Sequence, residues 1–167
     1  EYGSMLMLSH FKGHAMGGFG GALKNMSIGV ASARGKVWIH TSATSLVFED
    51  AFTADHDSFL ESMADADKAV MDFMGRENIA YITVANNLSV DCDCCAVAVD
   101  PCMKDIGILA ALDPGVIDQA CIDLVMQSDD PGREHFMERV NSRNGIHTIE
   151  AAAELGFGSR TFDLTEL

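Results

Sequence analysis

The chain has 167 residues, of which 48% are hydrophobic and 22% charged, which is the composition of a globular protein with a sizeable core. Its net charge of −14 argues against nucleic acid and anionic membranes as partners, and no apolar run is long enough to span a membrane. Five cysteines, three of them within residues 92–95, do not resemble a secreted disulfide framework, so a reducing, cytoplasmic compartment is expected.

A glycine-rich stretch over residues 9–25 follows the apolar residues 5–8, and its pattern predicts a strand, a loop and then a helix. Glycines in such a loop let the backbone approach a ligand closely, and amides at a helix start attract anions. The sequence therefore predicts a site for a small anionic ligand. Its candidate binding residues are His10, Lys12, His14, Gly18, Gly20, Gly21 and Lys24.

The distribution of charge supports this prediction. Residues 2–48 contain four basic residues and no acidic residue, so that segment carries +4, whereas residues 49–167 carry −17. A basic segment in an acidic protein is what an anionic small-molecule site requires. The alternative interpretation is a tight turn between a strand and a helix, with solvated lysines.

Residues 32–48 are predicted to form a short strand or a surface loop around Val37-Trp38-Ile39. From residue 57 apolar side chains recur at three- and four-residue steps, and Ser58 with Glu61 suggests a capping box, so a helix is expected as far as Gly75. Its acidic side chains, Asp67 among them, are expected mostly on the solvent face.

Residues 79–85 are apolar and β-branched, which predicts an interior strand, and residues 105–112 give a second strand. Asp113-Pro114 and Asp130-Pro131 each start a predicted helix, the first of which buries Cys121; a short helix then opens at His147, and residues 161–164 suggest an edge strand. This alternation predicts a single α/β domain over residues 1–167, with a mainly parallel sheet covered by helices on both faces.

Four cysteines fall close together with three aspartates, and Cys92 and Cys95 have the spacing that lets two thiolates reach one metal. An iron–sulfur cluster or a zinc ion is therefore expected here, with structural cysteines and redox-active thiols as alternatives. The neighbouring carboxylates disfavour the redox alternative, because they raise the pKa of a thiol. The predicted metal ligands are Cys92, Cys94, Cys95 and Cys102.

Motifs for known catalytic machinery are missing from the sequence: it has no G-x-S-x-G elbow, no H-E-x-x-H helix and no complete Walker loop. No catalytic residue is identified, and whether the protein is an enzyme stays open.

Several motifs spread over most of the chain together resemble one family. They are Ser9-His10-Phe11-Lys12-Gly13-His14 with Gly17-Gly18-Phe19-Gly20-Gly21-Ala22-Leu23-Lys24-Asn25, Asp91-Cys92-Asp93-Cys94, Asp105-Ile106-Gly107-Ile108-Leu109-Ala110, Asp113-Pro114 with Ile117-Asp118-Gln119-Ala120, and Arg143-Asn144-Gly145-Ile146-His147. This set resembles the bacterial and archaeal iron–sulfur-centre family called domain of unknown function 362. The resemblance implies an iron–sulfur-associated protein with a redox or electron-transfer role.

Two departures from that family are visible. Many members carry a cysteine-rich ferredoxin-like insert, whereas residues 41–57 occupy its place here and contain no cysteine. The family also has a long N-terminal portion before the motif at Ser9, so the chain is expected to be the C-terminal part of a longer architecture.

A second resemblance, confined to the glycine stretch, is to the nickel-pincer lactate racemase family. That family has a histidine, a Gly-Phe-Ser-Gly-Gly turn and a lysine ten residues after the histidine, and here His14 and Lys24 have the same spacing around a turn in which Gly20 replaces the serine. The corresponding residues of that family contact its nickel nucleotide cofactor. We carry over only an anionic-ligand site that His14 and Lys24 face.

The expected function is therefore that of a metal-binding or iron–sulfur-associated protein with a site for a small anionic molecule. The alternative is a non-enzymatic binding module, or the subunit of a homo-oligomer, in which the cysteines are structural.

Overall fold

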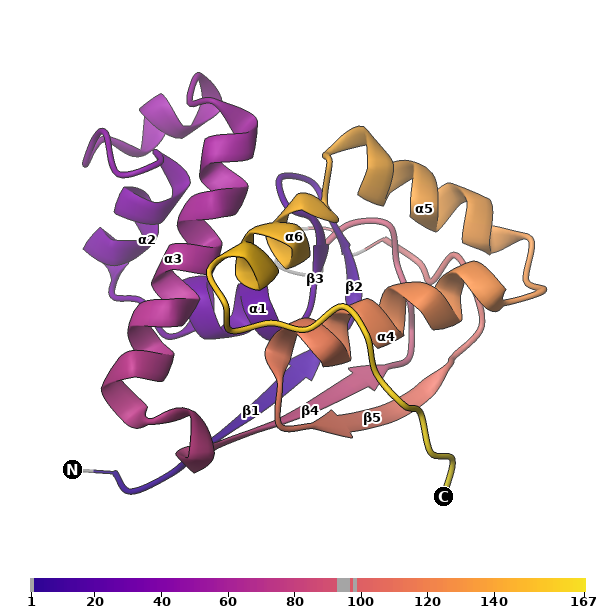
Figure 1. Cartoon of the computed structure of the whole chain (residues 1–167). Coiled ribbons are helices and arrows are strands. Elements are labelled where there is room, and N and C mark those ends of the chain that lie inside the picture. Colours follow the sequence, from indigo (N-terminus) through magenta and orange to yellow (C-terminus); the bar gives the residue numbers. More distant parts are fainter. Residues whose placement is uncertain (1, 93–96, 98) are drawn as a thin grey trace.

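The central sheet of the protein is built from the three apolar segments that the sequence predicts as strands. A computed structural model describes residues 2–92, 97 and 99–167 (Figure 1). In it the strands lie in the order β1 (Met5–His10), β4 (Ile79–Ala85) and β5 (Gly107–Ala111). A separate small hairpin consists of β2 (Lys12–His14) and β3 (Gly18–Gly20).

The sheet is mixed, so the expectation of a mainly parallel sheet is wrong. Strand β1 pairs with β4 in parallel, with Met5 opposite Ile79, but β4 pairs with β5 in antiparallel orientation. A parallel neighbour needs a connection that crosses over the sheet, usually through a helix. The described part of residues 86–106 contains no helix, and the chain returns directly beside β4.

The helical elements form two groups along the chain, one between β3 and β4 and the other after β5. They are α1 (Ala22–Lys24), the π-helical turn η1 (Asn25–Gly29), α2 (Ala33–His40), the 3-10 turn η2 (Phe48–Phe52), α3 (His56–Met74), the 3-10 turn η3 (Arg76–Asn78), α4 (Pro114–Gln127), α5 (Gly132–Ser142) and α6 (His147–Glu154). Within the described residues, no helix is long and apolar enough to cross a membrane.

The helices gather on one face of the sheet, and the expectation that helices cover both faces is also wrong (Figure 1). Side chains alternate between the faces along each strand, and those that point away from the helices are apolar yet accessible. Leu6 and Leu8 of β1 are 59% and 61% exposed, and Ile108 of β5 is 72% exposed. Because no described segment lies over this face, the sheet has an apolar outer face that water contacts.

Local capping explains where several helices begin. Asp113 accepts a hydrogen bond from the Val116 amide at the start of α4, as the Asp-Pro motif predicts. Asp55, rather than the predicted Ser58, caps α3 by accepting from the Ser58 amide.

Two segments differ in type from what the sequence predicts. The segment from Ala33 to His40 forms α2 instead of a strand or loop, because the Ser32 hydroxyl caps it by accepting from the Gly35 amide. Residues 161–164 form no strand; the C-terminal segment runs as irregular chain and borders a groove of about 820 Å³ beside β5 and α4.

A buried carboxyl group lies within the apolar core between the sheet and the helices. Asp67 of α3 is 0% exposed, although its predicted place is the solvent face, and neither of its carboxyl oxygens has a hydrogen-bond partner among the described residues. Burial raises the pKa of Asp67 well above its usual value, and the charge of Asp118 raises it further. Burial therefore favours the neutral form of Asp67 in the folded protein.

This neutral carboxyl predicts a particular dependence of stability on pH. Asp67 ionises in the unfolded chain above about pH 4, whereas burial favours its protonated form in the fold, so the folded state loses relative stability as the pH rises above that value. Asp67→Asn removes this loss, and its advantage over wild type in the free energy of unfolding should grow from pH 5 to pH 8 in urea titrations. Asp65→Asn, at an exposed position, serves as the control. An advantage that stays constant with pH would contradict the assignment.

Candidate functional site

The glycine stretch folds into the β2–β3 hairpin, which brings two lysines together. Lys12 of β2 pairs with Gly20 of β3, and Lys24 follows at the end of α1. A Cβ atom built on Gly20 would lie 3.5 Å from Cδ of Lys24 and 3.9 Å from Cε of Lys12. Both lysine side chains therefore pass over the same glycine, which has no side chain of its own to separate them.

His14, at the end of β2, is a buried histidine whose hydrogen bonds fix its tautomer. Its Nδ1 atom accepts from the amides of Met16 and Gly17 at 3.1 and 3.0 Å. Burial is the main cause that lowers the pKa of His14 to about 3, and the charges of Lys24 and Lys12 add to it. The ring is thus neutral at physiological pH, and its proton is on Nε2, which is a hydrogen-bond donor.

The pKa values of Lys24 and His40 are lowered, like that of His14, by burial and by nearby positive charges. Burial, with the nearby charges of Lys12 and Lys36, lowers the pKa of the Lys24 ammonium to about 8. Burial is also the main reason why the pKa of His40 is lowered, and Lys24 and Lys36 add to the effect, although the hydrogen bond between His40 and the Lys36 carbonyl opposes it. We call these mutually repelling groups the basic cluster: Lys12, His14, Lys24, Lys36 and His40.

The amides at the start of α1 are already occupied, contrary to the expectation that they await a ligand. The carboxylate of Asp118, from α4, accepts from the Ala22 amide at 2.7 Å and from the Leu23 amide at 3.0 Å. Asp118 is 0% exposed, and burial raises its pKa to about 7 although these two hydrogen bonds act in the opposite direction. An internal anion therefore takes the place that the sequence suggests for an external one.

Two of the candidate glycines serve this internal packing. A Cβ atom on Gly21 would collide with the Asp118 carboxylate, so only glycine lets that carboxylate reach the amides. Gly18 has a φ of +78°, and a Cβ there would lie 2.8 Å from Cα of Gly145. Gly20 alone of the three faces the lysines.

His10 occupies a different place from the other basic candidates. It ends β1 on the same side as Leu6 and Leu8, and its ring donates a hydrogen bond of 2.7 Å from Nε2 to the Asn86 carbonyl. The structure thus brings Lys12, His14 and Lys24 together and places His10 on the sheet.

The structure also adds three basic residues that sequence reasoning did not select. Lys36 and His40 lie on α2, and the ring of His40 stacks on Phe59 with centroids 5.2 Å apart. Arg139 of α5 contributes to lowering the pKa of His14, while its guanidinium forms an ion pair with Asp91 at 3.0 Å. Recognition of α2 as a helix would have revealed Lys36 and His40 as neighbours one turn apart, whereas no local signal connects Arg139 to the hairpin.

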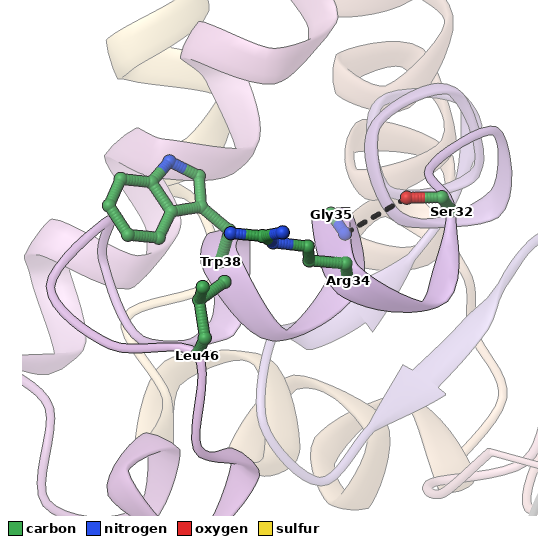
Figure 2. A pocket seen from close by; sticks show the side chains of 5 residues that line it. All are labelled: Ser32, Arg34, Gly35, Trp38 and Leu46. Atoms are coloured by element: carbon green, nitrogen blue, oxygen red, sulfur yellow. Dashed lines mark hydrogen bonds between the residues drawn. The ribbon is translucent and has the colours of Figure 1, made fainter.

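A separate pocket of about 400 Å³ lies beside α2, lined by Ser32, Arg34, Gly35, Trp38 and Leu46. Figure 2 shows the Arg34 side chain extending beside Trp38, with Leu46 next to both. Among the described residues that line it, Arg34 is the one charged residue, and none belongs to the basic cluster.

The cysteine segment is described only in part. Cys94 and Cys95 lie outside the described residues, as do Asp93 and residues 96 and 98. Cys92 is buried and its sulfur is in a disulfide, while the Cys102 thiol donates to the Leu88 carbonyl at 3.2 Å and burial raises its pKa. Cys121 is buried in the core, as predicted.

These observations do not provide a metal site within the described residues, where no group of three histidine, cysteine or acidic side chains is arranged to hold an ion. Metal binding by Cys92 requires its disulfide to be reduced. The iron–sulfur cluster or zinc ion stays a prediction from the sequence.

Metal and acid-labile sulfide analysis tests that prediction on protein purified with reductant and without oxygen or chelator. If the cysteines bind metal, wild type contains iron with sulfide, or one zinc, and the Cys92→Ser/Cys94→Ser variant loses it. Cys121→Ala, in the core, is the control and keeps the metal. A folded wild type without metal would make the cysteines structural.

Comparison with known proteins adds a family but no activity. No curated protein matches the chain significantly, and neither does any solved structure. One family model, described as domain of unknown function DUF362, matches residues 1–123, a range that includes the hairpin, α2, α3 and the whole sheet. The chain therefore belongs to the DUF362 family.

Proposed function

We propose that this protein binds a small anionic molecule at the basic cluster. The observation that supports the proposal is that burial and mutual repulsion lower the pKa values of His14, Lys24 and His40 together. Positive charges that repel one another in a partly buried place are relieved by a bound anion, and such perturbed groups are typical of functional sites.

The cluster offers donors of two kinds to such an anion. The ammonium groups of Lys12, Lys24 and Lys36 are charge-assisted donors, and the neutral ring of His14 adds the hydrogen on Nε2. Carboxylates and phosphates accept from both kinds of donor. The ligand is expected to be small, because the −17 charge of residues 49–167 repels an extended polyanion.

Calorimetric titration with phosphate, pyruvate and a nucleoside monophosphate tests the site. Loss of one charged hydrogen-bond donor should weaken binding about 10- to 100-fold, so Lys24→Ala weakens the preferred anion by that factor and Lys24→Arg preserves most of the affinity. Lys104→Ala, at an exposed lysine far along the chain, is the control and leaves affinity unchanged. Equal affinity in wild type and Lys24→Ala for all three anions would disprove the site.

The pH dependence of binding provides an independent check on the role of Lys24. Its pKa of about 8 means that the free protein loses this charge as the pH rises through 8. Affinity should therefore fall between pH 7 and pH 9.5 in wild type. In Lys24→Arg the charge persists over this range, and the decline should be largely absent.

A second candidate function, supported by the apolar outer face, is that of a subunit in an oligomer of this chain. Leu6, Leu8, Ile108 and Leu112 are all more than half exposed and come from or adjoin the two outer strands. The strand residues on this face carry no acidic side chain that would repel a second copy, unlike most of the surface of this acidic chain. Apolar patches of this kind often mark protein interfaces.

Light scattering tests the oligomer. Wild type should have the mass of more than one chain, and Leu8→Lys/Ile108→Lys should have the mass of one, because the two lysines would be buried without partners in the interface. Phe73→Lys changes another highly exposed apolar residue, on α3, and serves as the control. A monomeric wild type at all concentrations would exclude this candidate.

A further inference from the structure

Lys24 stands out within the basic cluster because of its surroundings. Its side chain is half-buried, and its Cδ packs over Gly20 next to Lys12. Among the described residues no carboxylate forms an ion pair with Lys24, unlike Lys68, which is paired with Asp72, and Lys104, which is paired with Asp129. The charges that act on the Lys24 amine are those of the cations Lys12 and Lys36.

Such an environment changes the chemistry of an amine. A lysine that is desolvated or placed next to another cation is deprotonated more readily, and the free amine is a nucleophile toward carbonyl carbon. The pKa of about 8 leaves roughly a tenth of Lys24 as free amine at pH 7, against less than a thousandth for an ordinary lysine. The Lys24 side chain can therefore act as a nucleophile when it is deprotonated and as a cation when it is protonated.

We propose that Lys24 forms an imine with small molecules that carry a carbonyl group next to a carboxylate, the 2-oxo acids. The inference rests on the anion site proposed above and specifies its ligand class. In a 2-oxo acid the carboxylate is one bond from the carbonyl carbon. The adjacent positions of Lys12 and Lys24 over Gly20 suit that compact pair, with the Lys12 ammonium on the carboxylate and the Lys24 amine at the carbonyl carbon.

The reaction balances without any oxidant or reductant. The lone pair on Nζ of Lys24 attacks the carbonyl carbon, a C–N bond forms, and the carbonyl π electrons move to the oxygen. The amine nitrogen then gives up its two protons to that oxygen, which leaves as water when the C=N bond forms. His14, with its proton on Nε2, is the neutral donor of the same cluster that is suited to stabilise the oxygen while it carries negative charge.

Reductive trapping tests the imine. Wild type is incubated at pH 7.5 with pyruvate and cyanoborohydride, which reduces an imine to a stable secondary amine, and the modified lysines are identified by peptide mass spectrometry. Pyruvate should label Lys24 much faster than Lys104, an exposed lysine outside the basic cluster. Acetone, which has the carbonyl but no carboxylate for Lys12 to hold, should label Lys24 more slowly than pyruvate does.

Lys24→Arg separates this inference from the anion site itself, because arginine keeps the charge but forms no imine under these conditions. The expected result is that this variant binds pyruvate by calorimetry and gives no adduct at residue 24. Equal labelling of Lys24 and Lys104 in a wild type that binds pyruvate would overturn the imine and leave the anion site intact. If wild type neither binds any tested anion nor forms an adduct, both proposals fail.

Discussion

The interaction on which the arrangement of the site depends is the pair of hydrogen bonds from the Ala22 and Leu23 amides to the buried carboxylate of Asp118. It joins the chain after the hairpin to α4, the helix that packs on β4 and β5, and Gly21 is needed for the carboxylate to approach. A buried carboxylate without donors would be strongly unfavourable, whereas two amide donors compensate much of its lost hydration. The turn into α1 is thereby held against the core, and Lys24 follows it directly.

This arrangement separates two kinds of charge over a very short distance. The carboxylate of Asp118 is buried at the start of α1, while the lysines of the cluster are partly or fully accessible. Because Asp118 occupies the amides, positive potential at the cluster comes from side chains and not from a helix end. Side-chain charge depends on protonation, so the positive potential at the cluster follows the protonation of Lys24 and not fixed backbone dipoles.

The elements that the sequence predicts correctly are those fixed by interactions between residues close together in the chain. The strand at Ile79–Ala85, the cap at Asp113 and the grouping of Lys12 with Lys24 all follow from patterns within a few residues. The orientation of β5 depends on a long connection whose described residues contain no helix, and the burial of Asp67 depends on what packs against α3, so neither has a local signal. Arg139 comes near the hairpin only through tertiary packing. The helix α2 is not predicted by the sequence pattern because its glycine and β-branched residues have low helix propensity, and the cap at Ser32 fixes where it begins.

The parallel pairing of Met5 with Ile79 has a consequence for how the chain folds. Strand β1 can pair with β4 only after the whole of α3 has been made, so this pairing is a long-range contact that forms late. The helices α2 and α3 depend mainly on contacts between residues close in sequence, so we expect them to form before β1 pairs with β4. During that interval the apolar strand β1 is exposed and can associate with other unfolded chains. Coexpression with chaperones should therefore increase the yield if the recombinant chain precipitates.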